Sequence, residues 1–298
     1  MSASVLSPCP GGTRSLSSAL AETVALFARA GIVDPQVDAE LLLGHLLGAG
    51  RGEVQAAAIR GDVLDADLDG RLADLAARRA AREPLQHLTG VAYFRHLSLA
   101  VGPGVFVPRP ETEMVAQIAI DALRASASPA PVAVDLGTGS GAIALALATE
   151  VPHARVHAAE NSVDAFVWTK ENFARVGADN ARLAFIDLAD AFPELDGTVS
   201  VLVSNPPYVP DAAVPRDPEV RRYDPPHALY GGADGLDVVR VLAEVGRRLV
   251  HPGGTIVIEH GELQGPSVRG VLTAAGWLAA ATHPDLTMRD RATTALRA

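Results

Sequence analysis

The sequence is short of cysteine, of aromatic residues and of basic charge. Cys9 is the single cysteine among 298 residues, so no disulfide can form within the chain. Lys and Arg total 25 against 35 Asp and Glu, a formal net charge of −10, whereas surfaces that bind nucleic acid through phosphates are basic. No apolar run approaches the roughly 20 residues of a membrane span, and residues 1–14 lack the order of a signal peptide. We therefore expect a cytoplasmic protein, monomeric, without membrane or direct nucleic-acid partner.

Hydrophobic periodicity divides the chain into four parts. Residues 1–14 are rich in Ser, Pro and Gly, which is typical of a disordered head. Residues 15–89 carry apolar side chains at three- and four-residue spacing, which predicts a small all-helical domain. Residues 90–107 contain two short strand-like runs joined by a turn, a β-hairpin that links the domains.

The fourth part, residues 108–298, alternates apolar strands with helices. This alternation predicts an α/β domain whose parallel sheet is covered on both faces. The predicted strands are Val132–Leu136, Arg155–Ala159, Arg182–Ile186, Val199–Ser204 and Thr255–Glu259, with a final pair at the end of the chain. The predicted helices are Ala142–Thr149, Asp164–Val176, Leu236–Leu249 and Val268–Ala275.

A glycine-rich loop follows the first of these strands. Its sequence is Asp-Leu-Gly-Thr-Gly-Ser-Gly, and an alanine-rich helix comes directly after it. Glycines let the backbone turn tightly and approach a ligand closely, and the helix N-terminus favours a negative or polar group. A dinucleotide would also suit such a loop. The candidate cofactor-binding residues here are Asp135, Gly137, Thr138, Gly139 and Gly141.

Acidic residues end the next two strands. Glu160 follows the second strand, where a carboxylate can accept hydrogen bonds from both ribose hydroxyls of a nucleoside cofactor. Asp187 follows the third strand and is placed to accept from an adenine amino group. Both residues are therefore candidates for cofactor binding.

The tetrapeptide Asn205-Pro206-Pro207-Tyr208 follows the buried strand Val199–Ser204. Two prolines force a rigid turn whose carbonyls no strand ladder can use. Asn205 Oδ1 and the Pro206 carbonyl can together accept both protons of an –NH2 group, which would hold that nitrogen in place while positive charge grows on it. Tyr208 can pack over the planar target. We expect Asn205, Pro206 and Tyr208 to be catalytic, Asn205 also to contact the cofactor, and all four residues to bind substrate.

Together these motifs resemble class I methyltransferases that act on planar amino nitrogens. Further stretches narrow the resemblance to the HemK/PrmC family, the release factor glutamine methyltransferases, over residues 16–298 in family order. These stretches are Pro-Leu-Gln-His-Leu-Thr-Gly at 84–90, Phe-Val-Pro-Arg-Pro-Glu-Thr-Glu at 106–113, Glu-Val at 219–220, Tyr-Asp-Pro at 223–225 and Ala-Leu-Tyr-Gly-Gly-Ala-Asp-Gly-Leu at 228–236.

The resemblance implies a Rossmann-like, mostly parallel seven-stranded sheet and S-adenosylmethionine as cofactor. It implies a peptide chain release factor as partner, methylated on N5 of the glutamine in its Gly-Gly-Gln loop and held in part by the helical domain. Arg109 and Glu111 would line the substrate or cofactor side of the cleft. The chain departs from the family in having Glu160 where Asp is usual, and Glu-His-Gly at 259–261 where Glu-Ile-Gly is usual.

Three other functions remain open at this point. A ribosomal-protein glutamine methyltransferase would use the same catalytic residues. A DNA adenine-N6 methyltransferase would share the turn, but the acidic charge and the lack of a base-recognition domain speak against it. A cofactor-binding scaffold without activity is disfavoured by the intact Asn-Pro-Pro-Tyr turn. We expect no metal site, because the histidines show no convincing ligand spacing.

Overall fold

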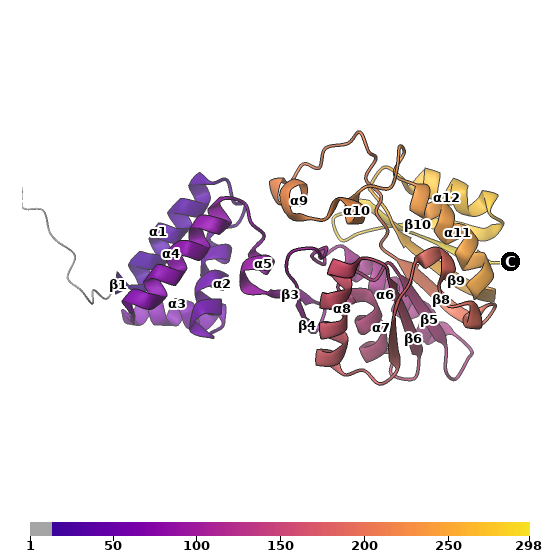
Figure 1. Ribbon diagram of the computed structural model, residues 1–298, viewed down its shortest axis with the longest axis horizontal. Helices are drawn as coiled ribbons and strands as arrows, with labels where there is room; N and C mark the ends of the chain where they lie inside the picture. Colours follow the sequence, from indigo (N-terminus) through magenta and orange to yellow (C-terminus); the bar gives the residue numbers. More distant parts are fainter. Residues whose placement is uncertain (1–13) are drawn as a thin grey trace, which may run out of the picture. The chain divides into compact units, whose positions relative to one another are not determined.

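The computed structural model describes residues 14–298 (Figure 1). The disordered head expected for residues 1–14 therefore lies outside the described residues except for Arg14. The chain forms two compact units, which divide between Gly90 and Val91. Within residues 14–298, no helix is both long and apolar enough to cross a bilayer.

The first unit is a helical domain with its own core. Its helices are α1 (Leu16–Arg29), α2 (Pro35–Leu47), α3 (Arg51–Arg60), α4 (Ala66–Ala80) and α5 (Leu85–Thr89). Ser15 caps α1 and Asp65 caps α4, each accepting a hydrogen bond from a backbone N–H of the first turn. The core is built from fully buried side chains such as Phe27, Leu42 and Leu72. A two-residue antiparallel pair joins β1 (Arg14–Ser15), before α1, to β2 (Val63–Leu64), between α3 and α4, and was not part of the prediction.

The second unit begins with the predicted hairpin and continues into a seven-stranded sheet. Strand β3 (Val91–Phe94) pairs antiparallel with β4 (Leu97–Ala100). The sheet has the order β10-β11-β9-β8-β5-β6-β7, in which β5 to β9 run parallel and β11 is antiparallel to both neighbours. Its strands are β5 (Val132–Leu136), β6 (Arg155–Glu160), β7 (Ala181–Phe185), β8 (Val199–Ser204), β9 (Val250–Glu259), β10 (Trp277–Pro284) and β11 (Asp290–Arg297).

Helices cover both faces of this sheet (Figure 1). Side chains alternate along β5, so that Ala133 packs into one core with α6 and α7, while Val134 packs into the other with α11 and α12. The long helices are α6 (Thr112–Ala125), α7 (Ala142–Glu150), α8 (Val163–Val176), α11 (Asp237–Leu249) and α12 (Gly265–Ala274). Short helices η1 (Leu188–Asp190), η2 (Pro193–Leu195), α9 (Pro218–Tyr223) and α10 (Pro226–Leu229) lie in the connections.

The strand order creates one switch point. From β5 the chain moves through α7 to β6 and β7 on one side, then returns through β8 to the other side of β5. In open parallel sheets ligands bind outside the carboxyl ends of the strands where the winding direction reverses. The glycine loop after β5 and the Asn-Pro-Pro-Tyr turn after β8 therefore begin at the two sides of the same crevice.

Candidate active site

A cavity of about 730 Å³ lies at this crevice. It is formed within the second unit, between the carboxyl ends of the central strands, the segment before α6 and the connection that contains α9 and α10. Every predicted site residue except Gly141 lines it: Arg109, Glu111, Asp135, Gly137, Thr138, Gly139, Glu160, Asp187, Asn205, Pro206, Pro207 and Tyr208.

The glycine loop leaves open space on its cavity side. Gly137 and Gly139 have φ values of +72° and +57°, and a Cβ added at either would meet no atom within 4 Å. Gly141, with a φ of +85°, is different, because a Cβ there would approach Phe173 to 3.1 Å. The first two glycines therefore widen the cavity, whereas Gly141 is required by the turn and by packing against α8.

Asp135 presents a buried carboxylate at the cavity wall. Asp135 is only 1% exposed. Its Oδ2 accepts hydrogen bonds from Thr138 Oγ1 at 2.6 Å and from Ala144 N at 3.1 Å. Oδ1 has no hydrogen-bond partner. Burial, the largest cause, raises the pKa of Asp135 to about 7. A polar or cationic group of a bound ligand would satisfy this oxygen.

Glu160 is fixed at the end of β6 by three backbone donors. Oε1 accepts from Asn161 N at 3.0 Å and Ser162 N at 2.8 Å, and Oε2 accepts from Gly139 N at 2.8 Å. The longer Glu side chain thus reaches across to the glycine loop. A carboxylate offers about four acceptor positions, so the three bonds leave little free capacity until a ligand displaces Gly139 N.

Asp187 lines the cavity beyond the end of β7, and both its carboxylate oxygens accept local hydrogen bonds. Its Oδ2 accepts from Asn161 Nδ2 at 2.8 Å, and its Oδ1 accepts from Ala189 N at 2.9 Å, which caps η1. Each oxygen retains acceptor capacity. The predicted role toward an adenine amino group is compatible with this geometry.

The Asn-Pro-Pro-Tyr turn is held from several sides. Ser204 Oγ donates to Leu136 O at 2.6 Å, which joins the ends of β8 and β5. Asn205 Nδ2 donates to Thr112 Oγ1 at 3.4 Å, so Oδ1 is the atom left for the cavity. Burial and the nearby negative charge of Glu259 raise the pKa of the Tyr208 hydroxyl above its usual range.

Gly231 and Gly235 lie in the stretch 228–236 that follows the turn in the sequence, and both approach the backbone of the turn closely. A Cβ at Gly231 would stand 2.4 Å from Pro207 O, and a Cβ at Gly235 would stand 2.2 Å from Tyr208 O. Gln264 Nε2 donates to the same Tyr208 carbonyl at 2.9 Å. The backbone of this stretch therefore packs directly on the turn and fixes its shape.

Arg109 spans the wall between two segments. Its Nη2 donates to Asp224 Oδ2 at 2.6 Å, and its guanidinium lies 4.9 Å from the Phe106 ring centre. Asp224 is 5% exposed, and burial raises its pKa. The ion pair ties the segment before α6 to the connection before α10, so Arg109 both lines the cavity and shapes it.

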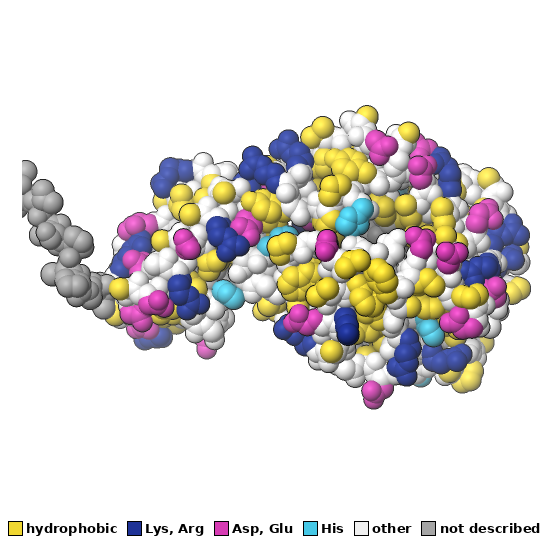
Figure 2. Space-filling view, in the orientation of Figure 1, with side chains coloured by type: hydrophobic (Ala, Val, Ile, Leu, Met, Phe, Trp, Pro, Cys, Tyr) yellow, Lys and Arg dark blue, Asp and Glu magenta, His cyan; other side chains and the backbone are white. Residues whose placement is uncertain are grey.

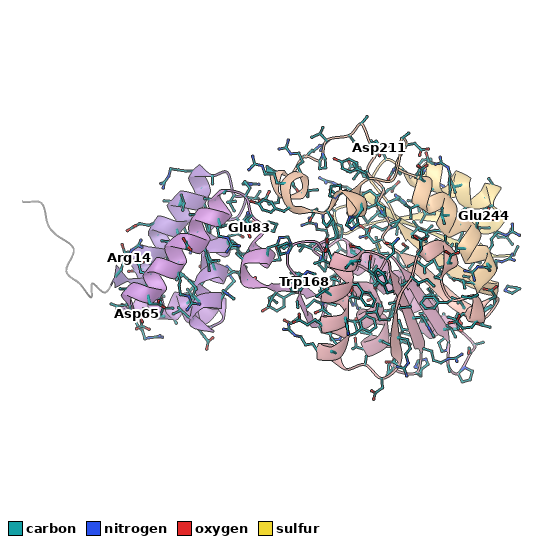
Figure 3. The ribbon with its side chains drawn as sticks, in the orientation of Figure 1. Arg14, Asp65, Glu83, Trp168, Asp211 and Glu244 are labelled. Atoms are coloured by element: carbon teal, nitrogen blue, oxygen red, sulfur yellow. The ribbon has the colours of Figure 1, made fainter. Side chains whose placement is uncertain are left out.

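The segment that follows the hairpin packs against α8 and reaches the cavity. Trp168, labelled in Figure 3, donates from Nε1 to Pro103 O at 3.1 Å. A Cβ at Gly102 would stand 2.4 Å from the Trp168 ring, so only glycine allows this approach. Gly104, two residues later, lines the cavity. The predicted linker thus forms part of the site's frame.

Comparisons with known proteins agree with this arrangement. Residues 18–90 match the PrmC N-terminal domain, and residues 97–217 match the methyltransferase small domain. A release factor glutamine methyltransferase of Streptomyces coelicolor is 50% identical over 95% of this chain and 98% of its own. The chain belongs to the release factor glutamine methyltransferase family.

The chain is also similar to one further curated protein and, in fold, to a solved structure. A 4-amino-L-phenylalanine/4-methylamino-L-phenylalanine methyltransferase of Streptomyces pristinaespiralis is 37% identical over 95% of each chain. A 16S rRNA N2 methyltransferase of T. thermophilus, solved with AdoMet and guanosine, is 19% identical with a TM-score of 0.51, covering 70% of this chain and 50% of that one. The second likeness concerns the fold alone. The predicted family, the fold class and the use of S-adenosylmethionine are thereby confirmed.

Sequence reasoning did not single out several residues at the site. Thr112 and Asn161 line the cavity, as do Asp217, Val220 and His227 from the connection with α9 and α10. Thr112 stood inside a quoted family stretch, next to Glu111, which was a usable signal. Among residues 14–298 no group of three or more His, Cys, Asp or Glu side chains is placed to hold a metal ion.

Proposed function

We propose that this chain transfers a methyl group from S-adenosylmethionine to N5 of the glutamine in the Gly-Gly-Gln loop of a peptide chain release factor. The observation that carries the proposal is the single cavity that joins the glycine loop, Glu160 and the Asn-Pro-Pro-Tyr turn. A cofactor site and an acceptor for a planar –NH2 group therefore adjoin each other. We also propose that the helical domain helps to hold the release factor.

The residues present fit this cofactor. Gly137 and Gly139 leave room beside the loop, and Asp135 Oδ1 is a buried oxygen without a partner. Glu160 and Asp187 offer carboxylates for ribose hydroxyls and an adenine amino group. When bound, S-adenosylmethionine supplies an electrophilic methyl group on a positively charged sulfur.

The chain's own contribution to the reaction is positioning. An amide nitrogen is a weak nucleophile because its lone pair is delocalised into the carbonyl. Asn205 Oδ1 and the Pro206 carbonyl accept hydrogen bonds from its two N–H groups, which raises the electron density on the nitrogen and fixes its position. The same acceptors stabilise the positive charge that develops before a proton leaves. Tyr208 packs against the planar group.

A second acceptor class shares the same chemistry. One relative is named as a methyltransferase of 4-amino-L-phenylalanine, whose amino group is also a planar –NH2 group. Asn205 and Pro206 can hold either an amide or an arylamine, so this candidate belongs in the test. On the face shown in Figure 2, acidic and basic side chains are interspersed over the second unit, without one continuous basic surface. This distribution favours a protein over a DNA substrate.

The test measures transfer of radiolabelled methyl from S-adenosylmethionine to purified release factor. A release factor whose Gly-Gly-Gln glutamine is replaced by alanine serves as the negative substrate. Label on the wild-type factor alone supports the proposal. Label on ribosomal protein, DNA or 4-amino-phenylalanine but not on release factor contradicts it.

Enzyme variants separate binding from transfer. Asn205→Ala should abolish transfer while the Kd for S-adenosylmethionine changes little. Asn180→Ala is the matched control, because its amide donates to Ala148 O and Ala154 O and does not line the cavity. Equal loss of transfer and of cofactor binding in Asn205→Ala would refute this division of roles.

A further inference from the structure

A buried carboxylate stands directly behind the Asn-Pro-Pro-Tyr turn. Glu259 ends β9, which runs parallel to β8, and Ile258 is the register partner of Ser204. Glu259 is therefore the neighbour of Asn205 across the ends of these strands. It is 1% exposed, its Oε2 has no hydrogen-bond partner, and it does not line the cavity. A buried charge is costly in free energy unless neighbouring groups pair with it or hydrogen-bond to it.

The neighbours of Glu259 connect it to the turn. The side chains of Thr112 and Tyr208 face its carboxylate, and both lower the pKa of Glu259. Thr112 is the first residue of α6 and is 4% exposed. Its Oγ1 also stands 3.4 Å from Asn205 Nδ2. Glu259, Thr112 and Asn205 thus form a chain of polar groups that ends at the cavity.

The direction of the hydrogen bonds in this chain is set by proton counting. A threonine hydroxyl has one proton to donate. If that proton goes to the Glu259 carboxylate, Thr112 Oγ1 can only accept from Asn205, and the amide must turn its NH2 group toward Thr112. A hydroxyl free to donate could instead bond Asn205 Oδ1, and the NH2 group would then face the cavity.

We propose that Glu259 is a positioning residue that fixes the orientation of the Asn205 side-chain amide. Through Thr112 it makes Oδ1, an acceptor, face the substrate –NH2 group. In the opposite orientation the Asn205 NH2 group, a hydrogen-bond donor, would face the substrate –NH2 group, which is also a donor. This inference rests on the proposed function of Asn205, and it gives the buried carboxylate at this strand end a role in the reaction.

The charge state of Glu259 supports a dependence on pH. Burial, the largest cause, raises its pKa to about 7. Thr112, Arg291 and Tyr208 lower the pKa, and the negative charge of Glu111 raises it. A protonated Glu259 can donate to Thr112 Oγ1, which frees the threonine proton for Asn205 Oδ1. The correct orientation therefore belongs to the ionised form, and kcat should fall as pH decreases below about 7.

The experiment compares kcat, KM and pH profiles of four enzymes. Glu259→Gln can either donate or accept, so kcat should fall at least fivefold and the limb near pH 7 should disappear. Thr112→Val removes the connecting hydroxyl and should lower kcat at least tenfold. Thr112→Ser keeps the hydroxyl and should retain a kcat within about threefold of wild type. In each variant the Kd for S-adenosylmethionine should stay within about threefold.

A readout without turnover separates this inference from the proposed function. The side-chain amide 15N resonance of Asn205, assigned by its disappearance in Asn205→Ala, should titrate near pH 7 in the wild type and not in Glu259→Gln. Absence of that titration in wild type, or a Glu259→Gln enzyme with unchanged kcat and pH profile, overturns the inference. A titration that follows the prediction in an enzyme inactive on release factor supports the inference and refutes only the substrate.

Discussion

Replacing Asn172 by alanine should weaken both the fold and the cofactor site. Asn172 lies on α8 and is completely buried. Its Oδ1 accepts from Ala100 N at 2.6 Å, and its Nδ2 donates to Ala100 O and to Ser140 O, each at 2.9 Å. One side chain therefore joins the hairpin, α8 and the glycine loop. Alanine leaves three buried backbone groups without partners.

The magnitude follows from these three bonds. A hydrogen bond contributes about 0.5–1.5 kcal/mol net, and a buried group left without a partner costs about 1–3 kcal/mol. Water can enter part of the space that alanine vacates, so we expect a loss of about 3 kcal/mol in the free energy of unfolding. For a domain of about 200 residues this corresponds to a Tm lower by about 6–12 °C.

Urea unfolding of the full chain, followed by tryptophan fluorescence, measures this loss, and calorimetric titration measures cofactor affinity. Because Ser140 lines the cavity, the Kd for S-adenosylmethionine should rise at least threefold in Asn172→Ala. Asn180→Ala removes a partly exposed amide with carbonyl partners of its own, so it should cost about 1 kcal/mol and leave the Kd unchanged. A loss below about 1 kcal/mol in Asn172→Ala, or an unaltered Kd, would refute the reasoning.

Three other changes test separate parts of the site. Glu160→Gln removes the charge that backbone donors face, so calorimetry should show a Kd for S-adenosylmethionine at least tenfold larger; an unchanged Kd would contradict the ribose role. Arg109→Ala leaves Asp224 buried without its ion-pair partner and should cost about 3–5 kcal/mol in urea unfolding, partly restored by adding Asp224→Asn. Burial raises the pKa of Asp135 from 3.8 to about 7 and the pKa of Glu259 from 4.5 to about 7. At a pH between the unfolded and the folded pKa of these groups, the folded chain therefore binds more protons than the unfolded chain. The free energy of unfolding without cofactor should therefore fall from pH 5 to pH 8 through these two groups, and Asp135→Asn should flatten that fall.

The candidate site was predictable from sequence because its residues sit at strand ends. Short apolar segments followed by glycine, acid or Asn-Pro-Pro locate the carboxyl ends of β5, β6 and β8, and parallel strands bring those ends to one edge. Gly141 shows the limit of this reasoning. Three glycines in one loop look equivalent in sequence, but only packing against Phe173 on α8 distinguishes the third.

Other features depend on contacts that sequence does not encode locally. Strand β9 begins at Val250 rather than at the predicted Thr255, although Pro252 and the following glycines are typical of a turn. The strand continues because Val250 pairs with Val199, and a register shift after Val199 accommodates the irregular residues. Thr112 and Glu259 are likewise far apart in the chain, and only the packing of α6 against the sheet brings them together.

Glu160, at a position where the family resemblance leads one to expect Asp, helps to hold the glycine loop in place before the cofactor binds. One further methylene lets the carboxylate bond Gly139 N, while Thr169 Oγ1 on α8 donates to Gly139 O. The glycine loop is thereby held at both its N–H and its carbonyl before any ligand arrives, and Asn172 holds the next residue. Ordering of this loop is then completed on folding and adds little to the cost of binding. A ribose that displaces Gly139 N exchanges one charge-assisted hydrogen bond for another, so the longer acid can serve the loop first and the cofactor afterwards.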